Sequence, residues 1–125
     1  MAQIRQTFQY AEEIGIDYVL FSIATPLPAT ELYDDAIAAN SLSDDFSFET
    51  FEFYGFGRGV ITTDEFTPFE LQVLRAFEWD RINFKTEERR QKIARMLGIS
   101  LQELDQWRRD TRRSVGIDVK SAANF

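Results

Sequence analysis

The segment YVLFSIA, residues 18–24, constrains this chain most, because it is apolar throughout except for Ser22. A strand that is apolar on both faces is typical of a parallel sheet whose two faces are covered by helices. Such a strand must pair along its edges, since buried main-chain N–H and C=O groups without partners destabilise a fold. The sequence therefore predicts a strand that pairs with a later segment, with a second copy of the chain or with a further polypeptide.

Helical signals stand on both sides of this predicted strand. Apolar residues recur at helical spacing over residues 2–14, and Gly15 stands where a left-handed C-terminal cap belongs. After TPLPAT, residues 25–30, the sequence predicts a helix over about 31–40 with Thr30 as its N-cap. A helix, a short turn and a buried strand form the second half of a βαβ unit, and we expect its first strand to lie outside this sequence.

The second half of the chain predicts three more helices. TPFE, residues 67–70, combines an N-cap Thr, a Pro at the first helical position and a Glu at the third, so a helix should run from there to about residue 81. Thr86 begins the next predicted helix, which ends at Gly98. A capping box of Ser100 and Glu103 begins the last, which runs to about Arg113. In the first of these helices the inward-facing residues should be Phe69, Val73, Leu74 and Phe77.

Composition excludes several kinds of site. The chain has no Cys and no His, so it can form neither a disulfide nor a thiolate or imidazole metal site of its own. No apolar run approaches the roughly 18 residues of a membrane helix, and we expect a cytoplasmic protein. The pairs of adjacent acidic residues, such as Asp34 and Asp35, are expected to be helix-start or loop carboxylates rather than catalytic groups.

Charge is distributed unevenly along the chain. Residues 1–80 hold 3 Arg and 15 acidic residues, whereas residues 81–125 hold 11 basic and 6 acidic residues. Such asymmetry favours packing of one half against the other, or against a partner of opposite charge. It can also mark a basic surface that binds nucleic acid.

KIARMLGISLQELDQW, residues 92–107, resembles a helix-turn-helix unit. In a DNA-binding unit of this kind, Arg108, Arg109, Arg112 and Arg113 would contact the nucleic acid. These basic residues lie at the end of the second helix, whereas recognition residues usually lie toward its start. A packed helical hairpin with a basic outer face is therefore the preferred interpretation, and a small DNA-binding or protein-interaction module is the alternative.

EEIGIDYVLFSIATPLPATELYDDA, residues 12–36, resembles the region around the last barrel strand of radical S-adenosylmethionine enzymes, especially those with a cobalamin-binding domain. Members of that group have a Gly-Leu-Asp-like turn and then the pattern FSIxTPxPGTxLY, where this chain has FSIATPLPATELY over residues 21–33. The later stretch TPFELQVLRAFEWDRINF and the helix pair after it resemble the C-terminal extensions of the group. The resemblance is close over residues 12–33 and looser beyond.

The resemblance implies an α+β, helix-rich fold. It would contain the last helix–strand–helix of a partial (β/α) barrel in residues 1–42 and a helical extension in residues 67–125. Residues 43–66 would form a connector rich in Phe and Gly, in which short strands near 51–54 and 60–63 could pair. The site residues implied at the end of the strand, facing the cofactor and substrate cavity, are Ser22, Thr25 and Pro26.

Two departures from the family pattern limit what this chain can do. Family members bind a [4Fe–4S] cluster through a CxxxCxxC loop and use S-adenosylmethionine, in this group together with cobalamin, but this chain has no Cys. We therefore expect a C-terminal fragment that binds no cofactor alone and is inactive alone.

Ala29 stands where the family usually has Gly. If the position needs a positive φ, Ala lowers the stability of the fold by about 1 kcal/mol. The expected partner is the missing N-terminal barrel portion, or a second copy that pairs through residues 18–24 to form a dimer.

Overall fold

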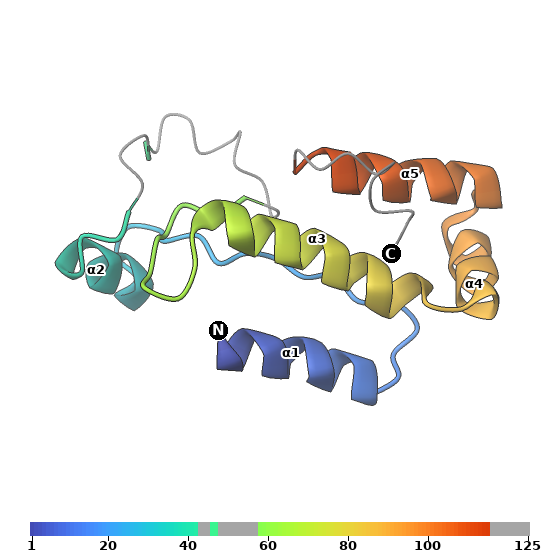
Figure 1. The fold of residues 1–125 in the computed structure, drawn as a ribbon, viewed down its shortest axis with the longest axis horizontal. Coiled ribbons are helices and arrows are strands. Elements are labelled where there is room, and N and C mark those ends of the chain that lie inside the picture. The colour runs from blue at the N-terminus through green and yellow to red at the C-terminus, as the bar shows by residue number, and fades with distance from the viewer. Residues whose placement is uncertain (43–45, 48–57, 116–125) are drawn as a thin grey trace. The chain divides into compact units, whose positions relative to one another are not determined.

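A computed structural model describes residues 1–42, 46–47 and 58–115, and the chain divides into two compact units. Unit 1 comprises Met1–Leu20 with Ala76–Phe125, and unit 2 comprises Phe21–Arg75. The helices in the described residues are α1 (Ala2–Glu13), α2 (Glu31–Ala38), α3 (Pro68–Phe84), α4 (Glu87–Leu97) and α5 (Leu101–Arg113) (Figure 1).

The predicted α+β class is wrong, because no β-strand occurs among the described residues. Residues 18–24 have no sheet partner there, so neither the strand nor the partial barrel is present. Of the two connector strands, the one near 60–63 is reduced to an isolated antiparallel bridge between Leu42 and Ile61. The other, near 51–54, lies outside the described residues. The division into a barrel fragment, a connector and an extension stays a prediction.

The predicted helix starts are confirmed by their capping hydrogen bonds. Thr30 and Thr86 accept from the main-chain N–H groups of Tyr33 and Arg89 at 3.3 and 3.2 Å. The pairs Thr67/Glu70 and Ser100/Glu103 each form a reciprocal capping box. The predicted glycine caps are also left-handed, with φ of 65° at Gly15 and 69° at Gly98.

Unit 1 is built around the C-terminal part of α3. Its core contains Trp79, Phe84, Ile93 and Leu104, all at most 2 % exposed. The Trp79 ring packs edge to face on Phe84 and on Trp107 of α5, with centroid separations of 5.2 and 5.0 Å. Phe8 and Ala11 bury one side of α1, which lies beside the C-terminal part of α3 (Figure 1). The core of unit 1 therefore combines α1 with three helices, α3, α4 and α5, that follow one another in the second half of the chain.

The buried positions of α3 differ from the prediction. Phe69 is 56 % exposed, whereas the buried residues of the helix begin at Ala76. The helix also continues to Phe84 rather than ending near residue 81. The reason is that α3 is covered from several directions near its C-terminal end, so no single apolar stripe describes its burial.

Unit 2 holds α2 and the loops around it. Ala36 and Val60 are buried, and the Thr62 N–H donates to the Ser41 carbonyl at 2.7 Å beside the Leu42–Ile61 bridge. The Gly59 N–H donates to Gln72 Oε1 of α3 at 3.1 Å. A Cβ atom built on Gly59 would lie 3.4 Å from the main chain of Pro68 and 3.6 Å from Ile23, which are ordinary van der Waals contacts.

Candidate functional site

The chain after α1 is held in unit 1 by a buried asparagine. Asn83 of α3 is fully buried; its Oδ1 accepts from the Val19 N–H at 2.9 Å and its Nδ2 donates to the Val19 carbonyl at 2.8 Å. The same Nδ2 also donates to the Trp79 carbonyl at 3.0 Å. The amide of Asn83 thus pairs with Val19 as a peptide group of a neighbouring strand would, which explains how residue 19 satisfies its main chain without a sheet.

Other side chains of α3 and α4 hold the residues just before Val19. Arg89 donates from Nη2 to the carbonyls of Ile16 and Asp17 at 3.2 and 3.3 Å, and from Nε to the Asn83 carbonyl at 3.0 Å. Lys92 forms an ion pair with the Asp17 carboxylate. Trp79 Nε1 donates to the Tyr18 hydroxyl at 3.2 Å. The segment is therefore recognised mainly through its main chain.

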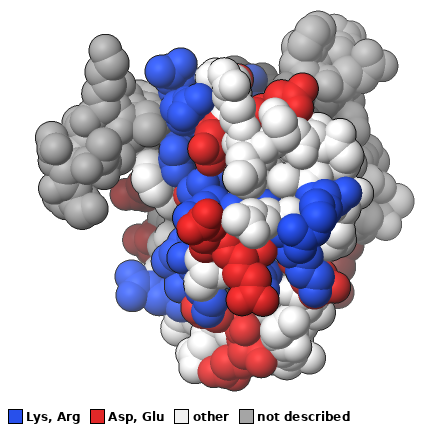
Figure 2. Space-filling model, turned by 90° about the vertical axis from the view of Figure 1, so that its right-hand side faces the viewer, with Lys and Arg blue, Asp and Glu red and all other residues white. Residues whose placement is uncertain are grey.

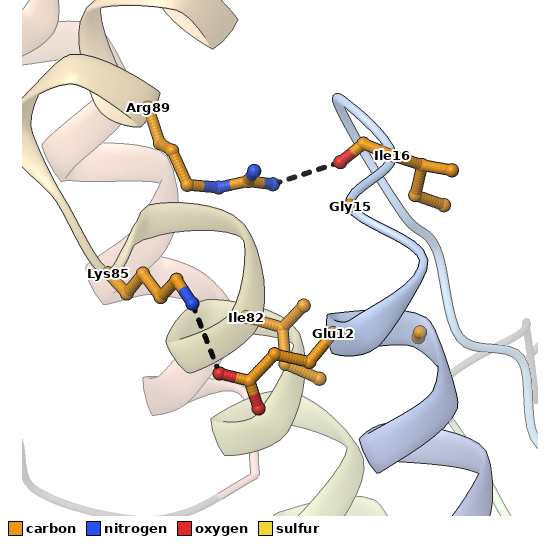
Figure 3. A pocket seen from close by; sticks show the side chains of 7 residues that line it. Glu12, Gly15, Ile16, Ile82, Lys85 and Arg89 are labelled. Carbon is orange, nitrogen blue, oxygen red and sulfur yellow. Dashed lines mark hydrogen bonds and ion pairs between the residues drawn. The ribbon is translucent and has the colours of Figure 1, made fainter.

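A small hollow lies beside these contacts, between the end of α1 and α3 (Figure 3). It has a volume of about 20 Å³ and is lined by Ala11, Glu12, Gly15, Ile16, Ile82, Lys85 and Arg89. That volume accommodates about one water molecule and is too small for an organic substrate. Its cationic side chains already bind Glu12 and the carbonyls that follow α1, so we assign it a structural role.

Ion pairs within unit 1 connect acidic residues near the N-terminus with basic residues of the second half of the chain. Arg81 and Lys85 bind the Glu12 carboxylate at 3.0 and 3.2 Å. The hydrogen bond from Arg81, followed by that from Lys85, lowers the pKa of Glu12. Together with the Lys92–Asp17 pair, these contacts join the acidic N-terminal part to the basic C-terminal part, as the charge pattern favours.

The residues predicted for the cofactor cavity lie in unit 2, in and just before the proline-containing turn. Ser22 is exposed, Thr25 is half-buried and Pro26 is buried. Arg75 Nε donates to the carbonyl of Phe21, which lies next to Ser22 in the sequence. The role of Ser22, Thr25 and Pro26 toward a cofactor stays a prediction.

The turn itself is closed by Thr30. Its N–H and hydroxyl both donate to the Leu27 carbonyl, at 3.2 and 2.6 Å, while its hydroxyl oxygen caps α2. Ala29 has a φ of 64°, in the left-handed region that favours glycine. This chain therefore forms the turn with a residue whose backbone conformation is strained.

The four arginines at the end of α5 have different surroundings. Arg108 Nε and Nη2 donate to the two Asp80 carboxylate oxygens at 2.7 and 3.1 Å, and Arg112 Nη1 donates to Asp80 at 2.8 Å. The side chains of Arg108 and Arg112 are only 17 % exposed. Arg108 also lies 5.0 Å from the centroid of the Phe84 ring, and its hydrogen bonds to Asp80 raise its pKa.

Arg109 and Arg113 are the other two predicted nucleic-acid contacts. Arg109 donates to Gln106 at 3.0 Å, and Arg113 is exposed. On the face shown in Figure 2, basic and acidic side chains of the described residues are intermixed. A protein that binds DNA through phosphates usually gathers its basic residues on one face. The arrangement brings Arg108 and Arg112 to Asp80 and leaves Arg113 accessible.

The chain offers no ligands for an iron–sulfur cluster. It has no Cys or His, and the described residues contain no group of three acidic side chains that could hold a metal ion. A [4Fe–4S] cluster needs thiolates, so the donor set here does not fit it. In the part of the chain that the structure describes, no helix is long and apolar enough to cross a membrane.

Sequence reasoning missed Asn83, whose side chain binds the main chain of Val19. Its signal is a polar residue within the buried run of α3, between Ile82 and Phe84. A buried amide must find hydrogen-bond partners, so this position indicates contact with main-chain groups from another part of the chain. The pattern by itself does not say which segment supplies them.

A comparison with known proteins shows one short similarity. Over 40 residues the chain is 45 % identical to an uncharacterized methyltransferase of Pyrococcus horikoshii. These residues make up 32 % of this chain and 9 % of the methyltransferase. No protein-family model and no solved structure matches the chain.

Proposed function

We propose that this chain is a C-terminal part of a radical S-adenosylmethionine enzyme of the cobalamin-binding type, with methyl transfer as the class of reaction. The observation that carries the proposal is the 45 % identity to a methyltransferase over 40 residues. The pattern FSIATPLPATELY over residues 21–33 supports the narrower assignment, because it is the part of the chain that most resembles that group.

The chain itself would contribute a shaped surface rather than the reacting groups. In unit 2 the Ser22 and Thr25 hydroxyls could hydrogen-bond to S-adenosylmethionine or to substrate, and the turn closed by Thr30 would orient them. The cluster must be held by cysteines of another polypeptide segment, since this sequence has none. By itself the chain is expected to bind no cluster and to be inactive.

The test is to express the tagged chain in its native host and purify it without oxygen. We expect a companion polypeptide that contains CxxxCxxC, in constant ratio to the chain and with iron and sulfide bound. Replacement of both Ser22 and Thr25 by Val should weaken binding of S-adenosylmethionine to that assembly, whereas Thr62→Val, at an exposed residue of the same unit, should not. A chain that purifies alone and forms a cluster on reconstitution would overturn the proposal.

The DNA-binding alternative has less support from the contacts. Two of its four arginines bind Asp80 and are largely buried, so phosphate contacts by them would require breaking these pairs. A mobility shift of duplex DNA that the chain causes at low salt, and that disappears at high salt, would favour this alternative.

A further inference from the structure

Residues 1–19 of unit 1, here called the N-terminal arm, are attached to the rest of the unit by few apolar contacts. In α1 the buried residues are Phe8 and Ala11, and residues 13–17 are all exposed. The helices α3, α4 and α5 instead enclose large side chains that are at most 2 % exposed, which are Trp79, Phe84, Ile93 and Leu104. Because burial of apolar surface is the main favourable term in folding, the arm should be held less firmly than this core.

Exposed ion pairs supply part of the attachment of the N-terminal arm. Arg81 and Lys85 bind the Glu12 carboxylate, and Lys92 binds Asp17 (Figure 3 shows the Lys85–Glu12 pair). The three cationic side chains are between 47 and 51 % exposed. Dissolved ions screen exposed pairs of this kind, whereas they do not weaken apolar packing. The arm should therefore be released more readily as the salt concentration rises.

The helix α1 depends on the same ion pairs. Its last turn carries Glu12 and Glu13 and no basic residue, so two carboxylates lie at the negative end of the helix dipole. At 12 residues the helix is also short enough to be marginal on its own in water. Once Arg81 and Lys85 no longer bind Glu12, α1 should unfold, so detachment of the arm and loss of its helix should occur in one step.

We propose that the N-terminal arm opens as one unit while the apolar core of unit 1 stays folded, and that salt promotes this opening. At its end the arm is bound through its main chain, by Asn83 at Val19 and by Arg89 just before it. In the closed state the arm occupies these side chains, and in the open state they face solvent. This opening involves residues of unit 1 alone and does not depend on the proposed function.

Native-state hydrogen exchange of the full chain, followed by NMR at a series of low urea concentrations, detects such an opening. The amides of Phe8, Ala11 and Val19 should exchange with one common dependence on urea. That dependence should be weaker than for the amides of Trp79 and Ile93, because release of the arm exposes less surface than global unfolding. An increase of potassium chloride from about 0.05 M to about 1 M should accelerate exchange of the arm amides about tenfold.

Two pairs of charge substitutions separate the ion pairs from a general effect of charge. Combined Lys85→Gln and Lys92→Gln should accelerate exchange of the arm amides about fivefold, because one contact to Glu12 and the contact to Asp17 are lost. Combined Arg95→Gln and Arg113→Gln is the matched control, since it makes the same change of charge at exposed residues of α4 and α5. The control should leave exchange of the arm amides unchanged.

A substitution in the core shows whether the core stays folded while the arm is open. Leu104→Val removes one buried methylene from α5 and should accelerate global unfolding exchange, seen at Trp79 and Ile93, about fourfold. Exchange of the arm amides should not change, because the core has the same packing in the closed and the open state. The substitution is mild enough that the chain should still fold.

Four outcomes would overturn the inference. They are one urea dependence shared by arm and core amides, exchange of the arm that does not respond to salt, equal effects of the two pairs of charge substitutions, and equal acceleration of both groups of amides by Leu104→Val. Capture of a companion polypeptide with CxxxCxxC would support the proposed function without bearing on the arm, so the two proposals can fail separately.

Discussion

Asn83 binds the N–H and the C=O of Val19, which lies 64 residues earlier in the chain. One fully buried side chain thereby provides the two hydrogen bonds that a neighbouring strand would make. An apolar segment that the sequence marks as a strand can in this way be held against a helix.

Replacing Asn83 by Ala should destabilise unit 1. The change leaves two main-chain groups of Val19 unpaired and a cavity in the core, and we expect a loss of about 3 kcal/mol in the free energy of unfolding. Urea denaturation measures the loss, and exchange of the Val19 amide should accelerate. Gln9→Ala is the control, because Gln9 makes only an exposed hydrogen bond to Glu13. An unchanged unfolding midpoint in Asn83→Ala would contradict the role of this residue.

Ala29→Gly should stabilise the protein. Ala29 has a φ of 64°, and relief of this strain should exceed the entropy cost of glycine in the unfolded chain, giving a net gain of up to about 1 kcal/mol. Ala39→Gly provides the comparison, since Ala39 has a φ of −83° and should lose stability when replaced. Thermal unfolding of the two variants should therefore shift in opposite directions.

Asp80→Asn should destabilise the contact between α3 and α5. Asp80 is 13 % exposed and binds two largely buried arginines, so its neutralisation leaves both with reduced charge compensation. The expected loss is about 2–3 kcal/mol in the free energy of unfolding. Asp105→Asn should cost at most about 0.5 kcal/mol, because that carboxylate is 49 % exposed. Equal effects of the two substitutions in urea denaturation would count against the buried pair.

Glu12 should make the stability of unit 1 depend on pH in the acid range. Its pKa in the folded chain is lowered from 4.5, mainly by Arg81 and then by Lys85. A carboxyl group with a lowered pKa stabilises the folded state above its ordinary pKa, and this contribution is lost as pH falls through the folded pKa. Wild type should thus exceed Glu12→Gln in stability at neutral pH, and the difference should vanish in acid. A difference that is constant with pH, measured by urea denaturation, would exclude this linkage.

The helices could be predicted from the sequence because their signals are local. The caps at Thr30, Thr86 and Ser100 and the glycine at 98 each act over one helical turn, and all four appear where the sequence places them. The sequence predicts strain at Ala29 only if that position has a positive φ, and the structure shows a φ of 64° there.

The strand prediction failed because a strand depends on its partner. Residues 18–24 have the composition of a buried strand, but pairing needs a second segment at the right distance, and composition does not provide one. Around Val19, Asn83 takes the place of that segment, through a contact across 64 residues that no local pattern encodes. For the same reason, Phe69 proved exposed although its spacing placed it on the inward face.

The sequence by itself determined where the capped helices begin and that the chain holds no thiolate or imidazole ligand. It also indicated that the acidic part of the chain would form ion pairs with the basic part. These properties depend on residue type and on neighbours within a few positions. Only the tertiary structure decided that Asn83 holds Val19 and that Asp80 holds Arg108 and Arg112. Such contacts depend on how distant segments pack, which is a property of the whole core rather than of any one stretch.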